Sequence, residues 1–359
     1  MRLAEVPLAA GGDEAPDASR LDWSALWTAC RMRWTRRRLL FRAFRKRGQL
    51  TCMADRTGLI RKGDVLCFST VRNEAERLPF FLDHHRALGV THFLFVDNDS
   101  DDGSRALLAA QPDVSLWWTG HSYRLSRFGM DWLTWLMLRY GHGHWCLTLD
   151  ADELFIYPHH DSRPLPALTA WLDAQGRTSF GAVMLDLYPK GPVADRTCRP
   201  GQNPLEVIDW FDAGNIVTKY QPPLKNLLVR GGVRRRVFFA AERERSPTLS
   251  KTPLIRWRRN YVYVSSTHSA LPTQLNRVRG RAAGDAPSGA LLHTKFLPSI
   301  VAKSREEKRR REHFANCALY EDYYDALIGN PDLWCPDSTR YEGWRQLEAL
   351  GIMSRGGWD

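Results

Sequence analysis

Short apolar runs alternate with amphipathic segments of helical length between residues 64 and 186. Strands are predicted over residues 65–71, 91–96, 114–118, 145–149 and 182–186, and helices over residues 76–88, 104–110, 130–140 and 165–174. Nearly every position of the strand runs is apolar, which is typical of strands that are covered on both faces. Strands joined by helices predict an α/β fold, with an open, doubly wound, mixed sheet and flanking helices.

The periodic pattern loosens after Pro189, where loops rich in Pro and Gly surround short apolar runs. Residues 299–327 regain a helical period, and Glu306 and Glu307 precede a pair of arginines by four residues, an order that favours exposed ion pairs. We interpret this charged run as a solvated helix face within a C-terminal helical segment, residues 301–359.

The N-terminal fifty residues differ from the rest. Residues 1–20 are rich in Ala, Gly, Pro and Asp without periodicity, and are predicted to be a disordered leader. Residues 21–50 form a basic amphipathic helical extension, because nine Lys or Arg and no acid lie between positions 31 and 47 of a chain whose net charge is +11. The helix lies either on an anionic membrane surface or, solvated, against the main domain. Nucleic acid is the least favoured partner of this helix.

The cysteines and the hydrophobic pattern of the sequence indicate where in the cell the protein is located. The seven cysteines are scattered and never spaced as Cys-x-x-Cys, so neither a disulfide framework nor a structural zinc site is indicated. The sequence has no basic start followed by an apolar run, and no apolar stretch of spanning length. We therefore expect a cytoplasmic protein, peripheral on the inner face of the cytoplasmic membrane if the basic helix binds lipid.

An acidic motif follows the fourth predicted strand. Asp150, Asp152 and Glu153 lie within four residues directly after a buried run, and such close carboxylates repel one another unless a cation neutralises them. Ligands of open α/β sheets bind beyond the carboxyl ends of the strands. The motif therefore predicts a Mn²⁺ or Mg²⁺ site whose remaining ligands are substrate phosphates. An acidic triplet on a solvated loop is the alternative interpretation.

Two other strand ends carry polar residues. Arg72, Asn73 and Glu74 follow the first strand and precede a helix, whose N-terminus offers N–H groups to an anion. Asp97 follows the second strand, where a carboxylate accepts hydrogen bonds from a ribose or a nucleobase.

Several motifs together resemble a known family. Their order and spacing are similar to those of the family-two-like glycosyltransferases of GT-A fold, and the bacterial branch with an Asp-x-Asp-Glu-Phe motif is most similar. The motifs are Arg72-Asn-Glu74, Asp83-His-His-Arg-Ala-Leu-Gly-Val90, Val96-Asp-Asn-Asp-Ser-Asp-Asp-Gly103 and Asp150-Ala-Asp-Glu153. Leu154 departs from the pattern, because it replaces the Phe.

The resemblance implies a GT-A catalytic domain over residues 64–300, with a nucleotide-sugar half (64–187) and an acceptor half (188–300). Its implied nucleotide-pocket residues are Thr70, Arg72, Asn73, Glu74 and Asp97, and its implied ligands of a metal-bound diphosphate are Asp150 and Asp152.

A C-terminal histidine often completes the metal shell in this family. His293 is preferred to His268 because it ends an apolar run, and Lys295 lies two residues further on, within reach of phosphate. Lys251 resembles a family position and is a further candidate for a phosphate contact.

The family usually carries a carboxylate as general base, and the sequence leaves Asp186, Asp209 and Asp212 open for that role. The expected activity is a metal-assisted transfer, inverting by the resemblance, of a sugar from a nucleotide-sugar to a glycan or lipid-linked acceptor in polysaccharide synthesis.

Two other functions stay open. The first is a phosphatase of the haloacid dehalogenase type, against which Leu154 argues, because that family needs a small hydroxyl residue two places beyond the second Asp. The second is a sugar-binding or membrane scaffold that has lost catalysis.

Overall fold

The structure is a computed structural model that describes residues 23–278, 286–310 and 317–359. The predicted leader, residues 1–20, lies outside the described residues.

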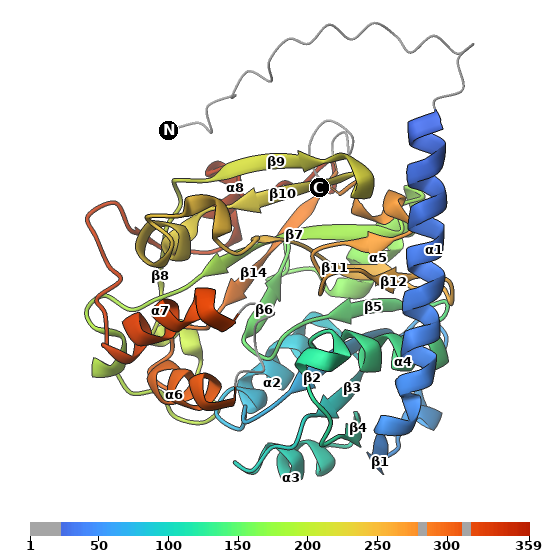
Figure 1. Cartoon of the computed structure of the whole chain (residues 1–359), viewed down its shortest axis with the longest axis horizontal. Helices are drawn as coiled ribbons and strands as arrows, with labels where there is room; N and C mark the ends of the chain where they lie inside the picture. Colours follow the sequence, from blue (N-terminus) through green and yellow to red (C-terminus); the bar gives the residue numbers. More distant parts are fainter. Residues whose placement is uncertain (1–22, 279–285, 311–316) are drawn as a thin grey trace, which may run out of the picture.

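A nine-stranded mixed sheet forms the centre of the molecule (Figure 1). In sheet order its strands are β1 (Thr51–Ala54), β4 (Val114–Trp118), β3 (His92–Asp97), β2 (Val65–Val71), β5 (Trp145–Thr148), β11 (Ser250–Arg256), β7 (Ser179–Asp186), β14 (Ser288–His293) and β6 (Glu153–Ile156). The neighbours β4, β3, β2 and β5 are parallel, as are β7 and β14. Strands β1, β11 and β6 run antiparallel to their neighbours, so the sheet is mixed as predicted.

Helices cover both faces of the sheet. The helices on one face are α2 (Leu78–Leu88), α3 (Ser104–Ala109), α5 (Leu165–Ala174) and α8 (Trp344–Ala349), whose apolar side chains join one core cluster. On the other face, α4 (Met130–Tyr140) packs against the alternate side chains of the same strands. The parallel strands β4, β3, β2 and β5 are therefore buried on both faces, which explains their continuous apolar sequences.

Two further helices lie together at one side of the molecule, on the left in Figure 1. They are α6 (Ile300–Arg310) and α7 (Cys317–Ile328), which contact each other. Short two-stranded sheets complete the chain, formed by β9 (Val217–Gln221) with β10 (Asn226–Arg230), β12 (Val262–Tyr263) with β13 (Ala270–Leu271), and β8 (Trp210–Phe211) with β15 (Thr339–Arg340).

The predicted basic helix is α1 (Trp23–Lys46), which runs along the opposite side of the molecule and packs on α4 (Figure 1). None of the described helices combines the length and apolar character that crossing a membrane requires.

The α/β class and the mixed sheet with flanking helices are confirmed. Strands β11 and β14 come from the segment assigned to the acceptor half, yet they lie in the same sheet as β5 and β7. Both predicted halves therefore contribute strands to one sheet.

Candidate functional site

A cavity of about 800 Å³ opens at the carboxyl ends of β2 and β5. The chain leaves β2 toward β3 on one side, whereas β5 lies on its other side, so this is the point at which the strand order reverses. Ligands of open α/β sheets bind at such a point. Nine of the predicted site residues line the cavity, namely Thr70, Arg72, Asn73, Glu74, Asp150, Asp152, Lys251, His293 and Lys295.

A series of hydrogen-bonded polar side chains includes three that line the cavity, Asp152, His293 and Arg234, and one that does not, Asp186. Nε2 of His293 lies 3.1 Å from Oδ2 of Asp152, and Nδ1 of the same ring lies 2.6 Å from Oδ1 of Asp186. Arg234 Nε donates to the other oxygen of Asp186 at 2.7 Å. Strand register creates this arrangement, because His293 ends β14 directly beside Asp186, which ends β7.

Neighbouring charges determine the protonation of these side chains. Burial alone would raise the pKa of Asp186, but Arg234 and His293 outweigh it and lower that pKa to about 2. Burial would also lower the pKa of His293, yet the carboxylates of Asp152 and Asp186 raise it above its usual value. The His293 ring is thus held between two carboxylates, and Asp186 orients it so that Nε2 faces the cavity and Asp152.

Lys251 holds the other two carboxylates of the acidic motif. It projects from β11, and its Nζ lies 2.9 Å from Oδ2 of Asp150 and also contacts Glu153. Burial alone would lower the pKa of Lys251, but these two carboxylates raise it. An ammonium therefore compensates Asp150 and Glu153, whereas Asp152 faces a histidine.

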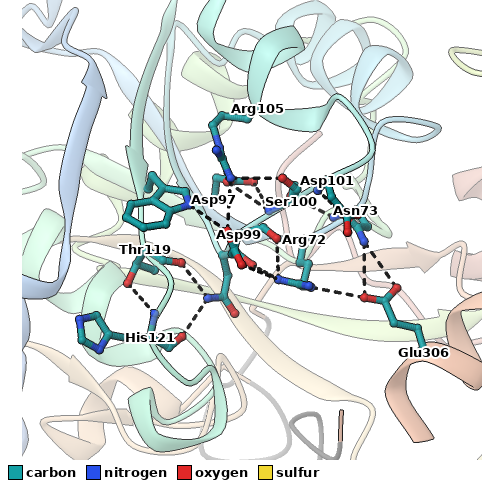
Figure 2. Close-up of polar contacts among 12 residues, drawn as sticks. Arg72, Asn73, Asp97, Asp99, Ser100, Asp101, Arg105, Thr119, His121 and Glu306 are labelled. Carbon is teal, nitrogen blue, oxygen red and sulfur yellow. Dashed lines mark hydrogen bonds and ion pairs between the residues drawn. The ribbon is translucent and has the colours of Figure 1, made fainter. Parts of the chain in front are cut away.

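The loop after β2 forms another part of the cavity lining, and Figure 2 shows its polar contacts. Arg72 donates to the backbone carbonyls of Asn98 and Asp99 at 2.8 and 2.6 Å, and Asn73 adopts a left-handed backbone with φ of 52°. Nε of Arg72 and Nδ2 of Asn73 each lie 3.4 Å from Oε1 of Glu306 on α6. The loop is thus held between the second strand end and a helix from the C-terminal segment.

The α6 contacts correct one interpretation of the sequence. The charged run of this helix was expected to be a solvated face, but Lys303, Glu306 and Glu307 line the cavity. Lys303 Nζ lies 2.6 Å from Oε1 of Glu74. The face is directed at the site because α6 follows closely on β14, the strand that carries His293.

Asp97 lies outside the cavity lining. Its side chain is fully buried, and Oδ2 accepts a hydrogen bond from Nε of Arg105 at 2.9 Å (Figure 2). In this structure the carboxylate stabilises the turn after β3, where Ser100 N also faces it.

The three candidates for the general base each carry an arginine partner. Asp186 pairs with Arg234, Asp209 with Arg340 and Asp212 with Arg236, each at 2.7 Å. None of the three belongs to the described cavity lining. A carboxylate held by a guanidinium is a weak base. The geometry therefore favours none of them as the group that accepts a proton from a substrate.

His268, the alternative histidine for the metal shell, also lines the cavity. Its Nδ1 lies 2.8 Å from the backbone oxygen of Ser250.

The side chains of the cavity offer few ligands for a divalent ion. Among the residues that the structure describes, no three or more His, Cys, Asp or Glu side chains are grouped as a metal shell. Two donors do converge, Asp152 and His293, and the second ring nitrogen of His293 is bound by a carboxylate, as is usual for metal-ligating histidines. Mg²⁺ and Mn²⁺ commonly take few protein ligands and complete their shell with phosphate and water. The pair therefore fits such an ion, while Asp150 is engaged by Lys251.

Sequence reasoning missed part of the site. Arg234 stood out only as one of three consecutive arginines, and nothing connected it with Asp186. Arg77, which lies 2.9 Å from Glu74, and Lys303 carried no signal, because each lies in a segment with an ordinary helical pattern.

Comparisons with known proteins give partial matches. No family model matches the chain. A stretch of 140 residues is 28% identical to a glycosyltransferase family 92 protein of Arabidopsis thaliana, covering 35% of this chain and 23% of the plant protein. The chain thus spans less than a quarter of that relative's length.

A solved structure with some similarity is a glucose-1-phosphate thymidylyltransferase of Bacillus anthracis in complex with sucrose. It is 10% identical, with 37% of this chain and 60% of that chain covered and a TM-score of 0.21. A TM-score this low carries no argument about the fold or the ligand of the present chain.

Proposed function

We propose that this chain is a glycosyltransferase of the GT-A type that binds a nucleotide-diphosphate sugar and transfers the sugar to a glycan or lipid-linked acceptor. The observation that carries the proposal is the Asp152–His293 pair, which lines a cavity at the reversal of strand order and in which Asp186 orients the histidine ring. The similarity to a protein named as a glycosyltransferase supports the same class.

The charge of the cavity suits a diphosphate. Its lining has eight Arg and Lys side chains against six Asp and Glu. Burial lowers the pKa of Lys295, and Asp152 counteracts that effect. Cations and the helix that follows the first strand end are the groups that bind phosphate in nucleotide folds. The cavity volume also lies in the range of small-molecule sites.

In the proposed mechanism Asp152 and His293 would hold Mn²⁺ or Mg²⁺. When bound, the ion supplies positive charge that stabilises the leaving diphosphate. Lys295 and Arg72 add fixed positive charge around the same phosphates, and Asp186 acts as a positioning residue because it fixes the His293 ring.

The reaction is a displacement at C1 of the sugar. The bond from C1 to the diphosphate oxygen breaks, the acceptor oxygen bonds to C1 from the opposite side, and the acceptor proton leaves to a base. Inversion follows from a single displacement.

A ligand panel tests the proposal. Thermal unfolding is measured with nucleoside diphosphates and their sugars, with Mn²⁺ or with EDTA. At about 100 times Kd a ligand of the folded state adds about 2.7 kcal/mol to the free energy of unfolding. At least one nucleotide-sugar should stabilise the chain with Mn²⁺ and much less with EDTA, and Asp152→Asn should abolish the difference.

Stabilisation by no nucleotide-sugar would refute the proposal, and so would an Asp152→Asn protein that keeps the response to Mn²⁺. Hydrolysis of a phosphomonoester without sugar transfer would favour the phosphatase instead.

A further inference from the structure

The outward face of α1 carries a line of exposed aromatic side chains. Trp23, Trp27, Trp34 and Phe41 are 75%, 72%, 71% and 61% exposed. Three of them are seven residues apart, and because seven residues nearly complete two helical turns they lie along one side of the helix. A folded protein rarely leaves three tryptophans of one helix in water, so this line indicates a surface that another phase or partner covers.

The inward face fixes the direction of that line. Leu39 and Ala43 are buried against the body. Arg42 Nε lies 2.6 Å from Oδ2 of Asp131, a fully buried carboxylate at the start of α4 that also binds Arg127 at 2.7 Å. With this face held by α4, the exposed aromatic side chains lie on the part of α1 that the body does not cover. The helix itself runs along one side of the molecule (Figure 1).

The same helix is strongly basic. Trp23–Lys46 contains eight Arg or Lys and no Asp or Glu. Arg33, Arg37, Arg38 and Arg45 are exposed beside the aromatic line. A second cavity of about 620 Å³, between α1 and the loops near Pro222 and Leu271, is lined by further cations. Apolar and cationic groups therefore share one face of the molecule.

We propose that α1 is the membrane-binding surface of this protein, and that it lies flat on a bilayer of anionic lipids. Tryptophan favours the boundary between head groups and acyl chains, and arginine is attracted to anionic head groups. The chemistry of the helix matches both layers of such a surface at once. Because Asp131 binds both Arg42 on α1 and Arg127 in the cavity wall, the bound helix holds the candidate site next to the membrane.

A second copy of the chain is the other occupant that the spacing permits. Residues 23, 27, 30, 34, 37, 41 and 44 follow the alternating four and three residue spacing of a helix pair. Pairing two copies would however bring together two helices that each carry eight cations and no acid, and like charges on facing helices repel. The charge favours the anionic surface.

Sedimentation of the full chain with vesicles tests the proposal. We expect binding to vesicles of phosphatidylcholine mixed with phosphatidylglycerol, and little binding to phosphatidylcholine alone. Arg37→Gln with Arg38→Gln should reduce the partition coefficient roughly fivefold for each arginine. Trp27→Ser with Trp34→Ser should weaken binding at high salt, where charge attraction is screened.

Matched controls remove the same groups elsewhere. Arg258→Gln with Arg259→Gln removes two exposed charges of the body, and Leu59→Ser removes an apolar side chain that is 61% exposed. Both controls should bind the mixed vesicles as the unaltered chain does.

The absence of binding to the mixed vesicles would overturn the proposal. So would equal losses in the α1 variants and the controls. Analytical ultracentrifugation tests whether a second copy of the chain occupies this surface instead. A dimer that dissociates in Trp27→Ser with Trp34→Ser would identify the aromatic line as a contact between copies, and this result would also overturn the proposal.

Discussion

Asp186→Asn separates the positioning role of this residue from an ordinary surface ion pair. The Asp186 side chain is fully buried, and it binds Arg234 at 2.7 Å and His293 at 2.6 Å. Asparagine keeps the size of the side chain but removes the charge. Arg234, whose side chain is only 9% exposed, then loses the charge of this carboxylate.

The expected magnitude follows from burial and charge. A pKa lowered from 3.8 to about 2 means that the ionised form of Asp186 adds roughly 2 kcal/mol to the free energy of unfolding at neutral pH. This stability is present above pH 3.8 and is lost as the pH falls through about 2. Breaking this buried ion pair also removes charge compensation from Arg234, so we expect a total loss of about 3–5 kcal/mol. Mn²⁺ affinity should fall by about 10 to 100 fold.

Urea unfolding and isothermal titration with Mn²⁺ and a nucleoside diphosphate measure the two effects. Asp209→Asn is the matched control, because its arginine partner is 66% exposed and an exposed pair contributes at most about 1 kcal/mol. Asp186→Asn could lose no more stability than Asp209→Asn and bind Mn²⁺ as tightly as the unaltered protein. In that case the contacts of Asp186 with Arg234 and His293 would not position the site.

Three further predictions concern other parts of the molecule. Burial lowers the pKa of His84 from 6.5 to about 4, so between those values only the unfolded chain binds this proton. His84 alone should therefore lower the free energy of unfolding by about 2 kcal/mol from pH 7 to pH 5. Urea unfolding of His84→Gln at both pH values should give a correspondingly smaller loss. A Cβ at Gly289 would lie 2.4 Å from the carbonyl oxygen of Ile156. Gly289→Ala should therefore lower the free energy of unfolding by about 1–3 kcal/mol, whereas Gly58→Ala, with open space around it, should not. Glu306→Gln removes the anion beside the arginine after β2, so titration should detect a severalfold tighter nucleoside diphosphate complex, and unchanged affinity would exclude α6 from the binding wall.

The parallel part of the sheet was predictable because burial on both faces leaves continuous apolar runs. The predicted limits of residues 65–71 and 114–118 agree with the structure at every position. The helix predicted to begin at residue 76 begins instead at Leu78, with Pro79 in its first turn, where proline is well accommodated.

The antiparallel strands were not predictable from the same pattern. Strand β11 contains Lys251 and Pro253, and β6 begins at the third carboxylate of the acidic motif, so neither sequence reads as a buried strand. Their burial depends on neighbours that are distant in the sequence. For the same reason the motif indicated the place of the site, while the pairing of Asp186 with a histidine 107 residues away appeared only in the folded chain.

Anomalous diffraction from crystals grown with Mn²⁺ and a nucleoside diphosphate addresses the central claim, the location of the donor phosphates. We expect one manganese peak within about 2.0–2.3 Å of an Asp152 carboxylate oxygen and of His293 Nε2, with both phosphates on the metal. A diphosphate bound outside this cavity, or a manganese peak that neither side chain contacts, would contradict the account.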